Sequence, residues 1–94
     1  MVGDLRELIN IGPGVEKQLY LVGIKTKDEF LKYEPFEIFN KMLKINPTLP
    51  KPMLASLVGA KENVLWYLII KDVVDDFEKK YPSHKWTKYQ KNIT

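Results

Sequence analysis

The sequence predicts an all-α domain, a compact bundle of five or six short helices whose first two form a helix-hairpin-helix-like unit. Apolar residues recur at spacings of three and four along most of the chain, which is typical of amphipathic helices. Turn-forming Gly, Pro and Asn residues separate these segments. Only residues 64–70 have the β-branched and aromatic composition of a strand, and no second segment could pair with them.

The N-terminal region predicts a helical hairpin. A short helix is expected at residues 4–9 and a second from Val15 to Val22, each with apolar residues at helical spacing. The intervening turn, residues 10–14, holds two glycines around a proline and cannot continue a helix. Gly23 is expected to end the second helix in the left-handed conformation, with Ile24 packing back against it.

Two further helices are predicted in the next part of the chain. Thr26 and Glu29 match a capping box, in which each side chain accepts a hydrogen bond from a free N–H of the first turn. This third helix is expected to end near Tyr33. Pro35 suits the first turn of a fourth helix, which Asn46 and the proline after it should stop.

The remaining helices follow a stiff proline-containing connector at residues 49–52. A fifth helix should begin near Met53 and break near Asn63, a residue that tolerates the left-handed conformation. Residues 64–70 are then assigned to a sixth helix, which continues as an amphipathic segment to about Lys80.

Charge divides the chain into a neutral domain, residues 1–81, and a basic polar tail, residues 82–94. The net charge is +3, but residues 1–80 carry equal numbers of basic and acidic side chains. The tail is either mobile or docks through Trp86. The excess charge lies on Lys85, Lys88 and Lys91.

Composition excludes several classes of protein. The absence of cysteine leaves neither a disulfide framework nor a thiolate metal site, and fits a reducing compartment. No basic and apolar leader opens the sequence, and the longest apolar run, residues 64–70, is too short to span a bilayer. We therefore expect a cytoplasmic protein that does not associate with membranes.

The turn before the second helix is the candidate site, since tight-turn glycines let successive N–H groups at a helix N-terminus face a phosphate. DNA would be the ligand, although Glu16 would repel it. The alternative is that the glycines only let two helices fold back closely. The candidate nucleic-acid-binding residues are Asn10, Gly12, Gly14, Val15 and Lys17.

Leu8–Pro13, Leu19, Val22–Thr26, Leu54–Ala60 and Trp66 follow one another along the chain. In this order and at these separations they resemble the C-terminal domain of the TfoX/Sxy competence-regulator family over about residues 5 to 68. In that family the domain usually follows an N-terminal domain, so this chain resembles a stand-alone version. The resemblance implies a compact helical fold with helix-hairpin-helix character and a role in nucleic-acid or protein interaction.

The sequence favours a non-enzymatic binding module without metal or cofactor. The one histidine, His84, is expected to be a solvated surface residue of the polar tail, so no general base is available. DNA binding through the turn is the leading hypothesis, and a protein-interaction or homodimerisation module is the alternative. The alternative rests on residues 64–70, which are apolar on every helical face and cannot all be buried against one small core. Either Tyr67, Leu68 or Ile70 faces outward, with Trp66 inside, or the fifth helix and the tail cover that side.

Overall fold

The computed structural model describes residues 4–86 and is all-α, as predicted. No strand occurs in that stretch, so residues 66–70 are helical despite their strand-like composition. The elements are a single 3₁₀ turn, η1 (Leu5–Glu7), followed by α1 (Pro13–Leu21), α2 (Lys27–Leu31), α3 (Pro35–Ile45), α4 (Lys51–Glu62) and α5 (Trp66–Lys80).

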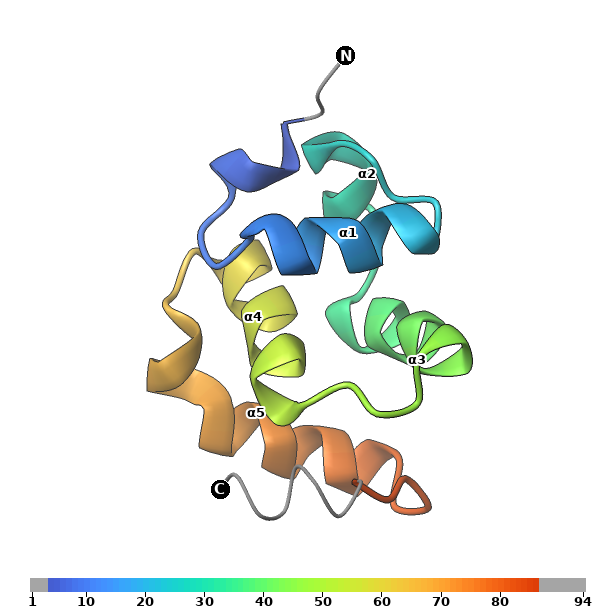
Figure 1. Ribbon diagram of the computed structural model, residues 1–94. Helices are drawn as coiled ribbons and strands as arrows, with labels where there is room; N and C mark the ends of the chain where they lie inside the picture. The colour runs from blue at the N-terminus through green and yellow to red at the C-terminus, as the bar shows by residue number, and fades with distance from the viewer. Residues whose placement is uncertain (1–3, 87–94) are drawn as a thin grey trace.

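Helix α4 lies at the centre of the bundle, with α1 across one of its ends and α5 across the other (Figure 1). It packs most extensively on α5 and also contacts α3, while α1 contacts α3 and η1. Six of its residues are buried, which explains why its sequence is apolar around most of its circumference.

The first element is shorter than predicted. Only Leu5–Glu7 form a helical turn, and Leu8 already has an extended backbone conformation, with ψ of 142°. Asp4 does not cap this turn; its carboxylate instead accepts a hydrogen bond of 2.7 Å from the backbone N–H of Lys27, the first residue of α2. A helix over residues 4–9 is therefore wrong, and the helix-hairpin-helix unit is reduced to one turn and α1.

The predicted helix-end motif at Gly23 is confirmed. Gly23 has a φ of +85°, and its N–H donates to the carbonyl of Tyr20 at 3.0 Å. The N–H of Ile24 donates to the carbonyl of Leu19 at 2.9 Å, and Ile24 is buried. These bonds satisfy the last carbonyls of α1 in a Schellman arrangement.

The capping box at the start of α2 is also confirmed. Glu29 N–H donates to the Thr26 hydroxyl at 3.2 Å, and the Glu29 carboxylate accepts from the N–H groups of Lys25 and Thr26. The Lys25 hydrogen bond is the main reason that the pKa of Glu29 lies below its usual value.

Three helices begin elsewhere than predicted. Helix α1 starts at Pro13 and α4 at Lys51, with Pro52 in its first turn, because a proline fits a first turn without losing a hydrogen bond. Asn63, with a φ of +61°, ends α4 as predicted. Helix α5 begins at Trp66, so the first two residues of the apolar run lie outside it.

The core extends into the described part of the tail. Trp86 is buried with 8% exposure, and its ring centroid lies 6.0 Å from Phe77, the aromatic centre of the core. Its indole N–H donates to the Glu78 carboxylate at 2.8 Å. Trp86 therefore docks, which was one of the two predicted alternatives.

His84 is not the solvated surface residue that was predicted. Its ring packs edge-on against Phe77 at 5.4 Å and Trp86 at 4.6 Å, and its Nε2 atom is buried without a hydrogen-bond partner. Burial lowers the pKa of His84, and the nearby Glu78 carboxylate opposes this shift.

Candidate interaction site

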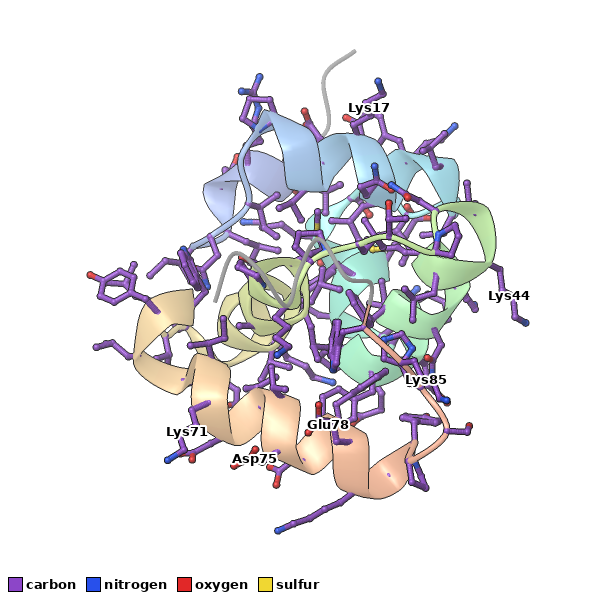
Figure 2. All side chains as sticks on the ribbon, turned by 60° about the horizontal axis from the view of Figure 1, so that its bottom comes forward. Lys17, Lys44, Lys71, Asp75, Glu78 and Lys85 are labelled. Atoms are coloured by element: carbon purple, nitrogen blue, oxygen red, sulfur yellow. The ribbon has the colours of Figure 1, made fainter. Side chains whose placement is uncertain are left out.

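The turn before α1 presents an open helix N-terminus. Gly12 is the N-cap residue, and no side chain caps the first turn. Pro13 has no N–H, so the amides of Gly14 and Val15 are the backbone donors at this end. Lys17, the remaining candidate, is exposed on α1 and points away from the body (Figure 2).

Neither glycine of this turn is required by close packing. A Cβ atom added at Gly12 or Gly14 would meet no other atom within 4 Å, and Gly12 has a φ of −99°, which any residue can adopt. These contacts do not support the explanation that the glycines let two helices fold back closely. Their effect is to leave the first turn of α1 uncovered.

Asn10, by contrast, is occupied within the protein. With a φ of +70°, it directs its side-chain amide toward the connection between α4 and α5. Its Nδ2 donates to the carbonyl of Val64 at 2.8 Å, and its Oδ1 accepts from the backbone N–H of Trp66 at 3.1 Å. The structure thus separates Asn10 from the other predicted site residues and gives it a structural contact.

Gly59 completes this contact, and we call the set Asn10, Gly59, Val64 and Trp66 the Asn10 junction. A Cβ atom at Gly59 would overlap both the Val64 carbonyl oxygen and the Asn10 Nδ2 atom. The Gly59 carbonyl also accepts from the Val64 N–H at 2.9 Å. Sequence reasoning missed this junction, because its two halves are more than fifty residues apart.

Glu16 should repel an anion at this turn less strongly than its formal charge predicts. Its carboxylate lies 3.4 Å from the Arg6 guanidinium and accepts a hydrogen bond from the Tyr20 hydroxyl at 3.2 Å. The Glu16 side chain is only 12% exposed, so part of its charge is compensated inside the protein.

A second surface lies at the start of α5. Leu65, Tyr67 and Leu68 are 37%, 58% and 67% exposed, and we call these three residues the α5 patch. The outward placement of Tyr67 and Leu68 agrees with the sequence prediction, while Ile70 is half-buried. Trp66 was expected in the core but is only half-buried, packing edge-on against Tyr67 at 5.8 Å.

Two other types of site receive no support within residues 4–86. No group of three or more acidic or histidine side chains is placed to hold a metal ion. No single helix in this range is long and apolar enough to cross a membrane; α4 and α5 meet that criterion only as a pair, bent by 108°.

Comparison with known proteins identifies the family. The sequence model of the TfoX C-terminal domain family matches residues 1–80. The chain belongs to this family. A crystal structure of an uncharacterized protein from Listeria monocytogenes has the same fold, with 25% sequence identity and a TM-score of 0.71. The alignment covers 86% of this chain and 97% of the Listeria chain. No curated protein matches.

The motifs that resemble the TfoX C-terminal domain family have structural roles in this chain. Asn10, Gly59 and Trp66 come from three separate motifs and meet in the Asn10 junction. Gly23 and Thr26 come from a fourth motif and form the end of α1 and the start of α2. Membership of the family therefore accounts for the fold rather than for a ligand.

Proposed function

We propose that this TfoX C-terminal domain is a non-enzymatic protein-interaction module whose contact surface is the α5 patch. The observation that carries the proposal is the exposure of Tyr67 and Leu68, each by more than half, on consecutive positions of one helix. Exposed apolar surface is costly in water, and a cluster of it favours a partner.

The three residues of the α5 patch can form the apolar centre of an interface, but they are too few to make up the whole interface. A stable interface buries about 800 Å² on each partner, with a dry apolar centre and a polar rim. Lys71, an exposed charged residue that follows Leu68 on α5, can supply part of that rim. A second copy of the chain is the proposed partner, because a two-fold contact covers the same patch on both molecules.

Light scattering and sedimentation across a concentration series test this proposal. We expect a reversible homodimer, and we expect Leu68→Glu to give a folded monomer, since an unpaired charge in a dry contact is strongly unfavourable. Ile45→Glu is the matched control, because Ile45 is 54% exposed at the end of α3, outside the patch. The control should dimerise like the wild type.

Three outcomes would count against self-association through the patch. A monomer at every concentration would refute the dimer. A dimer that Leu68→Glu leaves unchanged would place the contact elsewhere. Equal loss of dimer in the Ile45→Glu control would show that any added surface charge has this effect. Far-UV circular dichroism establishes that each variant is folded.

Nucleic-acid binding is the second candidate function, and the open first turn of α1 favours it. The amides of Gly14 and Val15 and the helix dipole would attract a phosphate there. Lys17 would add a positive charge nearby, with the tail lysines contributing. The neutral charge of residues 1–80 favours weak, salt-dependent binding.

Titration against duplex and single-stranded DNA at several salt concentrations tests this second function. Gly12→Val should abolish binding by covering the first turn, and it should leave the fold intact because its Cβ enters open space. Glu16→Lys should strengthen binding by replacing repulsion with attraction. Unchanged affinity in both variants would eliminate the turn as a phosphate site.

A further inference from the structure

A groove lies between the start of α3, the end of α4 and the middle of α5, on surface that the α5 patch does not include. Its volume is about 640 Å³. Phe36, Val58, Ile69 and Val73 supply its apolar lining. Three of these are only partly buried, and Val73 is 7% exposed, so the groove offers an apolar lining to a ligand that enters it.

The charges around this groove are unbalanced. Glu34, Glu62, Asp72 and Asp76 line it, against a single basic residue, Lys61. The Lys61 ammonium lies 3.2 Å from the Glu34 carboxylate and donates to the carbonyl of Tyr33 at 3.3 Å. Within residues 4–86 no ion pair forms to Glu62, Asp72 or Asp76.

We propose that this groove binds a basic amphipathic helix of a partner protein. Apolar side chains at helical spacing would enter the groove, and lysine or arginine side chains beside them would meet the carboxylates of Glu62, Asp72 and Asp76. The excess of negative charge favours a basic partner, because the apolar walls of the groove concentrate the electric field of its carboxylates. The same field repels nucleic acid, so the groove is not part of the candidate DNA site at the turn before α1.

The probe is a labelled synthetic peptide of about fourteen residues, with leucine on one helical face and lysine on the other. Its counterpart carries glutamate in place of every lysine. We expect the full-length protein to bind the lysine peptide, with affinity falling as salt rises. NMR spectra should show the largest shifts for the methyl groups of Val58, Ile69 and Val73.

Charge reversal provides the decisive variants. Asp72→Lys combined with Asp76→Lys should weaken binding of the lysine peptide at least about tenfold and create binding of the glutamate peptide. Asp75→Lys is the matched control: Asp75 is exposed on the same helix and points away from the body, but it does not line the groove (Figure 2). It should change affinity by less than about threefold.

Several results would overturn the proposal. These are equal affinity for both peptides, equal effects of the groove and control variants, and NMR shifts confined to the α5 patch. A titration that changes with protein concentration alone would mean that a second copy occupies the groove. The oligomeric state of the Asp72→Lys and Asp76→Lys double variant is measured as well. If it equals that of the wild type, a loss of peptide binding reports on the groove alone, and the proposed dimer is tested separately by Leu68→Glu.

Discussion

The glycines of α1 and α4 show how the same residue type has opposite meanings at two positions. Gly14 sits in the first turn of α1 with open space where a Cβ atom would be, so the fold does not require it. Gly59 sits in α4 against the Val64 carbonyl and the Asn10 side chain, which leave no room for a methyl group.

This contrast predicts opposite effects of one chemical change. Gly59→Ala should lower the free energy of unfolding by about 1–3 kcal/mol, because the backbone of the α4–α5 connection must move. Gly14→Ala should leave stability unchanged or raise it by up to about 1 kcal/mol, since alanine is the better helix former. Urea denaturation of both variants checks the pair, and equal effects would contradict the geometry of the Asn10 junction.

Residue-scale features that depend on neighbours in sequence could be predicted, and those that depend on tertiary contacts could not. The Gly23 helix end and the Thr26–Glu29 capping box involve residues within five positions of each other. The sequence predicts a nucleic-acid contact for Asn10, because nothing in it indicates that the Asn10 amide donates to the carbonyl of Val64, 54 residues later. The same limitation hid the partner of Asp4.

At the scale of elements, the segment after α5 acts as a strap across the aromatic core. Residues 82–86 contain polar Ser83 and Lys85, and the sequence left open whether this segment is mobile or docks through Trp86. In the structure the rings of both His84 and Trp86 face the core. His84 packs on Phe77, and Trp86 packs on Phe39 at 5.9 Å. Exposed and inward-facing residues alternate over only five positions, and so short a pattern does not distinguish a docked segment from a solvent-exposed loop.

The strap predicts a pH dependence of stability. Burial holds the pKa of His84 below its usual 6.5, so an unfolded chain binds a proton that the folded chain does not. Stability should therefore be highest above about pH 6.5 and fall as the pH decreases below it. His84→Phe keeps an aromatic ring and removes the titration, so its stability should vary less between about pH 7 and 5.5. An identical slope in both proteins, measured by thermal denaturation, would contradict this account.

At the scale of the whole molecule, one core connects both ends of the described chain. Leu5 and Trp86 belong to the same buried cluster, which includes residues of every helix between them. The order of the five α-helices within residues 4–86 could be predicted because apolar spacing encodes them locally, whereas the helix expected at residues 4–9 is only a 3₁₀ turn. Which surfaces remain open could not, since the exposed α5 patch and the acidic groove both result from how α3, α4 and α5 pack.

Because the chain has a single core, a destabilising substitution at one end should lower the stability measured at the other end. Trp86→Ala removes a ring that packs on Phe39 and Phe77, and a large-to-small change of this kind costs about 3 kcal/mol. It also leaves Trp66, which belongs to the Asn10 junction at the other end of α5, as the sole tryptophan fluorophore.

The experiment compares two probes of the same unfolding transition. In Trp86→Ala, Trp66 fluorescence and far-UV circular dichroism should report one shared midpoint, shifted to lower urea than in the wild type, because a small domain with one core unfolds in a single step. Lys85→Ala is the control, since Lys85 is exposed, and its midpoint should not move. A Trp66 transition that stays in place while the circular dichroism shifts would show that the strap and the Asn10 junction belong to separately unfolding units.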